Sequence, residues 1–192
     1  RRVWVGRALG GSAITWGGAG QRWGGGQAAA AASSVAVEVD QYFPRLTKGY
    51  SELRALQKDF DERGYDMARW DIDGDIRRRL GTVGTVSPLF GLEKVLTKMR
   101  VAMENAEEAG GDLGVDPVEF AELGTEVVAG IVETDFLAYS AIFADPSGMV
   151  GRKGQSSQDY LRRTKDALDK TTRLLGSMLE MLHISPAGEA GG

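Results

Sequence analysis

The sequence feature that most constrains the fold is a helical spacing of apolar residues, which recurs in separate segments between residues 42 and 184. In the first segment, apolar residues stand seven, three and four positions apart: Leu46, Leu53, Leu56 and Phe60. Such spacing places the side chains on one face of an α-helix. Pro44 suits the first turn of this helix and Gly64 suits a left-handed cap at its end, so the sequence predicts a helix over 44–63.

A second helix is expected to begin at Ser87-Pro88, where serine can cap the first turn and proline can occupy its first position. Gly110-Gly111 is expected to end it. A third helix is expected to begin at Asp116-Pro117, with Glu119 completing a pattern close to a capping box. We expect it to run to about residue 144. Its expected apolar face comprises Val118 or Phe120, Leu123, Val127, Ile131, Asp135 or Phe136, Tyr139 and Phe143.

A fourth helix is expected to begin near Ser156 or Ser157, with a leucine-rich stripe that reaches Leu182. No strand-like alternation is sustained anywhere in the chain. Four long amphipathic helices with short to medium links predict an all-α fold, an up-down four-helix bundle over residues 42–184. Residues 1–41 form a Gly/Ala/Trp-rich N-terminal segment of irregular sequence, and residues 185–192 are expected to form a flexible tail.

Composition excludes several classes of function. The chain of 192 residues has no cysteine and one histidine, His183, which excludes disulfides and a cysteine nucleophile and leaves little room for a zinc site or a Ser-His-Asp triad. The net charge of −4 gives no general case for nucleic-acid binding. No apolar run has the length of a membrane span. The sequence therefore predicts a protein that is not an enzyme, with no catalytic residue, no cofactor and no metal site.

The N-terminal segment has an unusual charge. Residues 1–37 contain four arginines and no acidic residue, a charge of +4, so the remaining residues carry −4 − 4 = −8. Three of the four tryptophans lie there: Trp4, Trp16 and Trp23. Ser34-Val35-Ala36 has the small-x-small pattern of a signal peptidase site. The segment is either a targeting remnant or a retained arm, and in a retained arm the tryptophans are expected to contact a neighbouring protein or lipid surface.

The stretch "DIDGDIRRRLGTVGTVSPLFG", residues 71–91, offers three interpretations. Its aspartates lack the glycine and glutamate positions of a calcium loop, and its glycines lack the spacing of a phosphate loop. The favoured interpretation is a short helix over 71–80, a glycine bend and a Ser-Pro cap, with an anion site at the bend as the alternative. Three arginines in this stretch are candidate partner contacts: Arg77, Arg78 and Arg79.

Four blocks of the sequence resemble the PsbQ family, in the order "IRRRLGTVGTVSPLFGLEKVL", "DPVEF", "ETDFLAYSAIFA" and "QDYLRRTKDAL". The resemblance is closest to the PsbQ-prime-like extrinsic proteins of photosystem II in red algae and red-lineage plastids, and it covers about residues 42–184. It implies a four-helix bundle in the thylakoid lumen that is peripheral to the membrane. Such proteins dock on photosystem II core and extrinsic subunits and help to retain calcium and chloride at the manganese cluster. The Trp-rich segment departs from the family.

On this basis the sequence predicts a docking subunit whose contacts are made by surface charges. Besides the three arginines of residues 71–91, the candidate contacts are the loop pair Arg152 and Lys153 and the helix pair Arg162 and Arg163. Two alternatives stay open. In the first, the same fold links a photosystem to its light-harvesting antenna through the N-terminal segment. In the second, a helical bundle binds an anion or another ligand at the glycine bend.

Overall fold

The computed structural model describes residues 39–108, 114–144 and 156–184, and within these ranges the chain is helical, with no strand. The long helices are α2 (Phe43–Arg63), α4 (Leu92–Glu108), α5 (Pro117–Phe143) and α6 (Ser157–Met181). Three short elements lie between α2 and α4: a 3₁₀ turn η1 (Met67–Arg69), a π-helix η2 (Ile72–Arg77) and the single turn α3 (Arg78–Leu80).

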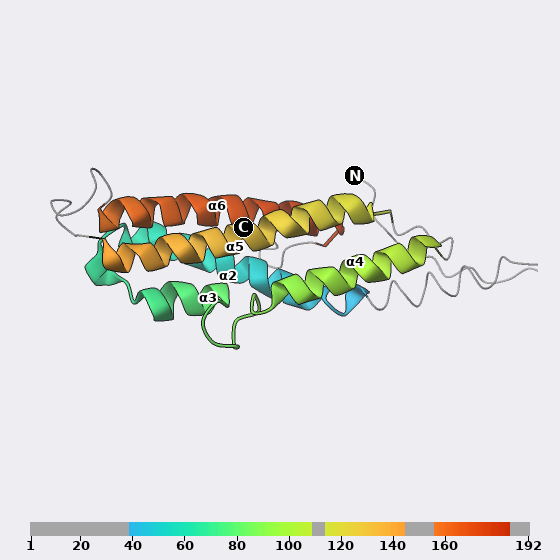
Figure 1. The fold of residues 1–192 in the computed structure, drawn as a ribbon, viewed down its shortest axis with the longest axis horizontal. Coiled ribbons are helices and arrows are strands. Elements are labelled where there is room, and N and C mark those ends of the chain that lie inside the picture. The colour runs from blue at the N-terminus through green and yellow to red at the C-terminus, as the bar shows by residue number, and fades with distance from the viewer. Residues whose placement is uncertain (1–38, 109–113, 145–155, 185–192) are drawn as a thin grey trace, which may run out of the picture.

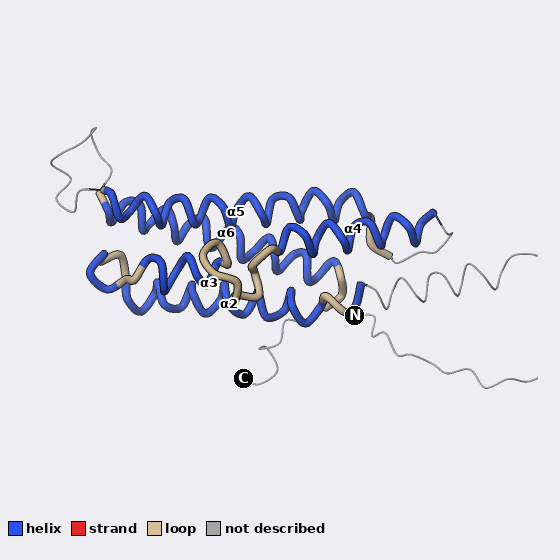
Figure 2. Tube along the Cα trace, turned by 60° about the horizontal axis from the view of Figure 1, so that its bottom comes forward, coloured by secondary structure: helices blue, strands red, loops and turns tan. Residues whose placement is uncertain are grey.

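The helices lie along one long axis, and successive long segments run in alternating directions (Figure 1). α5 packs most extensively on α6, and α2 packs on the other side of α6. α5 also packs against η2 and α4, which are separated along the chain by α3 and the loop that follows it. Figure 2 shows the loop between α3 and α4 crossing the middle of the molecule. This arrangement is compatible with the expected up-down four-helix bundle.

The predicted helix starts are confirmed for α5 and α6. The Asp116 side chain accepts hydrogen bonds from the backbone nitrogens of Val118 (2.8 Å) and Glu119 (3.4 Å). At α6, Ser156 and Asp159 form a capping box, in which each side chain bonds the backbone nitrogen of the other residue. Asp159 consequently has a lowered pKa, because the backbone nitrogen of Ser156 and then its hydroxyl donate hydrogen bonds to the carboxylate.

The predicted start of α4 is wrong by one turn. Ser87 does act as a cap, since its hydroxyl accepts a hydrogen bond from Leu89 N at 3.1 Å. The turn that it opens ends at Gly91, whose φ of +63° is left-handed, and α4 begins only at the next residue. Serine and proline therefore initiate a separate turn, because the left-handed glycine stops the helix from continuing through it.

The predicted apolar face of α5 is wrong in its second half. Phe136, Tyr139 and Phe143 are exposed by 65%, 43% and 71%, whereas the smaller Thr134 and Ala138 are fully buried. The cause is the close approach of α5 to α6. A Cβ on Gly130 would overlap the hydroxyl oxygen of Thr171, so this side of α5 admits only small residues. The aromatic residues of α5 are therefore turned away from α6.

Trp70 shows how the chain between α2 and η2 is held to the core. Its ring lies 4.3 Å from that of Phe60, and its indole nitrogen donates a 3.0 Å hydrogen bond to the carbonyl oxygen of Gly64. It is 93% buried as a result, with only 7% of its surface exposed.

Among the described helices, none combines the length and the apolar character needed to cross a membrane.

Candidate docking surface

The loop between α3 and α4, residues 81–91, is hereafter called the corner. It begins at Gly81, which has a φ of +74°. A Cβ at this position would overlap the backbone nitrogen of Phe90, so only glycine fits. The backbone nitrogens of Thr82 and Val83 then donate hydrogen bonds of 3.1 and 3.4 Å to the carbonyl oxygen of Arg77. These amides cap the end of the preceding helix and are not directed at an outside ligand.

The far side of the corner is attached to α2. Arg45 donates a 2.9 Å hydrogen bond from Nε to the carbonyl oxygen of Pro88, and a second one from Nη2 to that of Phe90. Leu89 is buried and contacts Gly49 of α2. Ser87 donates a 2.6 Å hydrogen bond to the carbonyl oxygen of Arg79. The corner is therefore held at both ends by polar and apolar contacts.

Two of the three predicted contact arginines are bound within the protein. Arg77 pairs with Asp135 of α5 and with Asp73, each at 2.9 Å. The hydrogen bond to Asp135 raises the pKa of Arg77 above its ordinary value, against the opposing effect of burial. Arg78, in contrast, is exposed, and it has no ion pair with any described carboxylate.

Arg79 is held in the same way, between two carboxylates of α2, Glu52 and Asp59. Burial lowers its pKa, but the hydrogen bonds to both carboxylates outweigh that effect, and the net shift is upward. Both bound arginines thus stabilise the attachment of η2 and α3 to the long helices. Of the three arginines, Arg78 is the one whose charge is free to meet a partner.

The three aspartates of residues 71–91 have structural roles as well. Asp71 caps η2 by accepting a 3.1 Å hydrogen bond from Gly74 N, and Asp75 accepts one of 2.6 Å from Arg63. Asp73 pairs with Arg77. Within the described residues, no group of three or more acidic or histidine side chains is placed to hold a metal ion. The helical interpretation of this stretch is confirmed, since η2 and α3 span residues 72–80.

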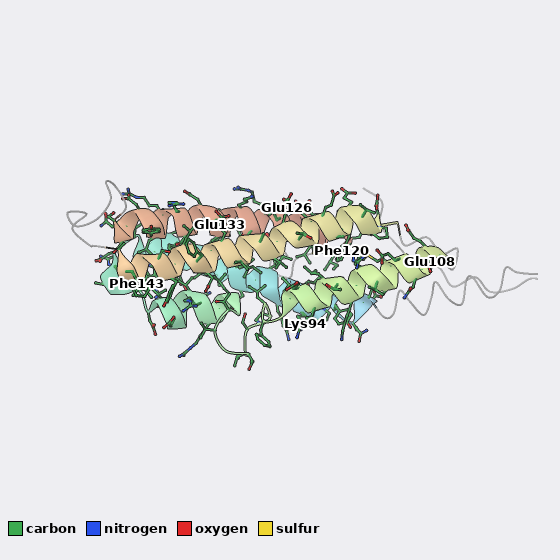
Figure 3. All side chains as sticks on the ribbon, viewed as in Figure 1. Lys94, Glu108, Phe120, Glu126, Glu133 and Phe143 are labelled. Atoms are coloured by element: carbon green, nitrogen blue, oxygen red, sulfur yellow. The ribbon has the colours of Figure 1, made fainter. Side chains whose placement is uncertain are left out.

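An exposed surface around the corner combines apolar and basic side chains. Val86 is 98% exposed and Phe90 is 43% exposed. One shallow groove beside Val86 is lined by Arg45 and Lys48 of α2 and by Glu52, which pairs with Arg79. A second groove beside Phe90 is lined by Arg45 again and by Lys94 and Lys98 of α4. We give the name basic face to six of these residues: Val86, Phe90, Arg45, Lys48, Lys94 and Lys98. Lys94 is labelled in Figure 3, on the side of α4 that lies away from α5.

The positive charges of the basic face are not neutralised by described neighbours. Lys48, Lys94 and Lys98 are exposed, and none of them lies within 4.0 Å of a carboxylate in the described part of the chain. Arg45 bonds backbone carbonyl oxygens and not acids. Sequence reasoning missed this surface. One available signal was the i, i+4 spacing of Lys94 and Lys98 on the polar side of their helix.

The other predicted contact residues lie apart from this surface or outside the described residues. Arg162 and Arg163 are exposed near the start of α6. Arg162 pairs with Asp159 at 3.6 Å, and Arg163 lies over the ring of Tyr160 at 5.8 Å. The remaining five fall outside the described residues: Arg152, Lys153, Trp4, Trp16 and Trp23.

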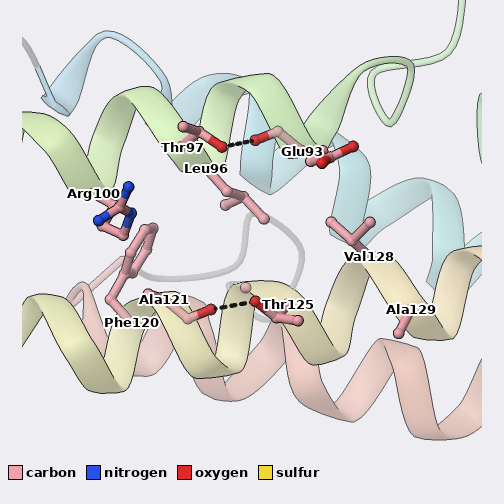
Figure 4. Close-up of a pocket in the computed structure, with 10 residues that line it drawn as sticks. Glu93, Leu96, Thr97, Arg100, Phe120, Ala121, Thr125, Val128 and Ala129 are labelled. Carbon is pink, nitrogen blue, oxygen red and sulfur yellow. Dashed lines mark hydrogen bonds between the residues drawn. The ribbon is translucent and has the colours of Figure 1, made fainter.

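A groove of about 320 Å³ lies between α4 and α5 (Figure 4). Its walls are mainly apolar, with Leu96 from α4 and Phe120 from α5. The two threonine hydroxyls in it already bond carbonyl oxygens of their own helices, Thr97 to Glu93 and Thr125 to Ala121, each at 2.9 Å. The groove therefore offers apolar contact and not a set of converging catalytic groups.

Comparison with known proteins gives no relative. No family model matches the chain, and no significant match is found among curated proteins or solved structures. A family assignment therefore has only the sequence blocks between residues 76 and 168 to support it, and a functional assignment depends on the surfaces described above.

Proposed function

We propose that this chain is a non-catalytic extrinsic subunit of photosystem II, with an up-down four-helix bundle of PsbQ type. In this proposal it resides in the thylakoid lumen of a red-lineage plastid, peripheral to the membrane. It docks on core and extrinsic subunits and helps the manganese cluster to retain calcium and chloride. The four sequence blocks support the family, and the alternating directions of the long helices support the bundle.

The single observation that supports docking most strongly is the basic face. Val86 is an apolar side chain that is 98% exposed, and the corner that carries it is held at both ends. It can therefore enter a partner's pocket with little loss of conformational freedom. Uncompensated charges around an apolar centre resemble the anatomy of protein interfaces, in which a polar rim surrounds the contacts that carry affinity. A basic surface on a chain of net charge −4 also orients the protein toward an acidic partner.

The anion-binding alternative has weaker support. At the corner, the amides of Thr82 and Val83 are bonded to Arg77 O, and the Thr82 hydroxyl contacts both that oxygen and Asp135. A carboxylate in that position repels an anion.

The linker alternative depends on the N-terminal segment, and no described contact favours it over docking on the photosystem core.

Reconstitution tests the proposal directly. Photosystem II particles from a red-lineage alga, stripped of extrinsic proteins by salt washing, are supplied with the full chain and sedimented. We expect stoichiometric rebinding and a partial recovery of oxygen evolution without added calcium and chloride. Rebinding of antenna complexes without any effect on oxygen evolution would favour the linker. Failure to bind the particles at low salt would contradict both forms of docking.

A further inference from the structure

A second exposed surface, on α5, differs in chemistry from the basic face. Its centre is an apolar strip at successive steps of four, three and four residues, consisting of Val132, Phe136, Tyr139 and Phe143. All four are exposed by 43% or more. Val128 continues the strip at the same spacing into the groove between α4 and α5. An apolar surface therefore follows α5 from about its middle to its end.

This strip is covered only in part by described residues. The guanidinium of Arg77 lies 4.6 Å from the centre of the Tyr139 ring, and Phe143 meets that ring edge-on at 4.9 Å. Phe136 and Val132 remain exposed by 65% and 59%. Large exposed apolar residues that are contiguous along a helix mark a contact surface, because burying them releases free energy.

Acidic side chains accompany the strip. α5 contains five acids and no basic residue, and of the five only Asp135 forms an ion pair with a described residue. The other four lie at helical spacing on the part of the exposed surface nearer α6: Glu119, Glu122, Glu126 and Glu133. Figure 3 shows Glu126 and Glu133 on the α6 side of α5, with Phe143 on the other side. An occupant of this surface must combine apolar groups with positive charges.

We propose that the occupant is the N-terminal segment of the same chain, residues 1–37. It contains four arginines, no acid and three tryptophans, which is the complement of an apolar strip with an acidic border. Tryptophan supplies a large apolar contact area, and arginine pairs with exposed carboxylates. The basic face repels the segment, so this contact leaves the proposed docking surface open. The inference applies to the chain that retains residues 1–37 and does not depend on the proposed function.

The distance is within reach of the segment. The described chain starts at Val39, which is 4% exposed and packed in the core. The start of α2 shares a groove with α4, and α4 shares the next groove with α5. Two helix spacings of 8–10 Å separate α2 from α5 across the bundle. The start of α2 lies level with the part of α5 near Phe120, and Phe136 lies about 24 Å further along α5 at a rise of about 1.5 Å per residue, so the strip is on the order of 30 Å away. Trp23 precedes Val39 by 16 residues, and a chain of that length reaches at most about 50 Å when extended.

Tethering also favours the contact. A segment in the same chain as its binding site is present at an effective concentration that reaches the order of millimolar. A weak contact is therefore sufficient to keep the surface occupied. The N-terminal segment of a second copy of the chain would have to compete with the tethered segment, which is present at this higher local concentration.

Paramagnetic broadening in nuclear magnetic resonance tests the proposal in the full chain. The protein has no cysteine, so a spin label attached to Ala129→Cys, exposed on α5 beside the strip, is unique. The indole signals of Trp16 and Trp23 are expected to lose most of their intensity. A label at Ala55→Cys, exposed on α2, is the matched control and should leave them largely unchanged. Equal intensity with both labels would overturn the proposal.

Two further measurements separate the occupants. Phe136→Ser in the Ala129→Cys chain should restore the indole intensity, because it removes an exposed apolar contact without disturbing the core. High salt should also restore the indole intensity of the Ala129→Cys chain, because salt screens the attraction between the arginines and the exposed carboxylates. Mixing an unlabelled isotope-enriched chain with a spin-labelled chain tests for a second copy. Broadening in the mixture equal to that within one chain would assign the surface to dimerisation and overturn the intramolecular contact.

Discussion

Arg77 of η2 donates a 2.9 Å hydrogen bond from Nε to Oδ1 of Asp135 in α5, across 58 positions of sequence. Both side chains are mostly buried, with 20% and 19% of their surfaces exposed. From the sequence, Arg77 was expected to contact an outside partner, and Asp135 was an alternative to Phe136 on the expected apolar face of the helix. The structure joins the two, and it thereby attaches the short corner helices to α5.

This relationship predicts a difference between neighbouring arginines. Arg77→Ala leaves Asp135 without its main partner in a mostly buried position, and we expect a loss of about 1–3 kcal/mol in the free energy of unfolding. Arg78→Ala removes an exposed side chain and should change that free energy by about 0.5 kcal/mol or less. Urea unfolding measures both. Equal losses in the two variants would show that the Arg77–Asp135 pair contributes nothing to stability.

The corner predicts a contrast between two glycines with left-handed backbones. Gly81→Ala combines a φ of +74° with an overlap between the new Cβ and the backbone of Phe90, so the corner must move. Gly84 has a φ of +77°, but the Cβ of Gly84→Ala would meet no atom within 4 Å. This substitution should therefore lower the free energy of unfolding by only about 1 kcal/mol. We expect a larger loss in Gly81→Ala, measured by thermal or urea unfolding. A tolerated Gly81→Ala would mean that the corner is not packed as described.

The capping box of α6 predicts a pH dependence. The pKa of Asp159 is lowered in the folded protein, so its contribution to stability is present above the ordinary aspartate pKa of 3.8. That contribution is lost as the pH falls through the lowered pKa. Asp159→Asn removes it, so the variant should lose less stability between neutral and acidic pH than the unmodified chain. Asp166→Asn, an exposed position on the same helix, is the control and should follow the unmodified chain.

The sequence predicted the helices well because their signals are local. Pro44 and Gly64 placed α2 to within one residue of its start, and Asp116 and Ser156 predicted the starts of α5 and α6. The start of α4 was wrong because Ser87-Pro88 is an equally good signal for an isolated turn. The residue that distinguishes the two is Gly91, four positions after Ser87, whose left-handed backbone ends the turn.

The surfaces were harder to predict because they depend on tertiary contacts. Large apolar residues were expected to face the core, but Gly130 and Thr171 bring α5 and α6 so close that the small side of α5 is buried and Phe136 is exposed. The basic face joins residues of α2, the corner and α4 that are far apart in sequence, such as Arg45 and Phe90, which are 45 positions apart. No single segment of the sequence carries that pattern.

The central claim is that the basic face docks on photosystem II, and paired charge reversals test it most directly. Lys94→Glu/Lys98→Glu reverses two cations of the basic face, and Lys170→Glu/Arg173→Glu makes the same change in net charge on exposed positions of α6. Sedimentation with salt-washed particles measures the apparent affinity of each variant as the salt concentration is varied. We expect the first variant to bind at least about tenfold more weakly at low salt, a loss of about 1.4 kcal/mol, and the second to bind like the unmodified chain. Equal binding by both variants would contradict the account.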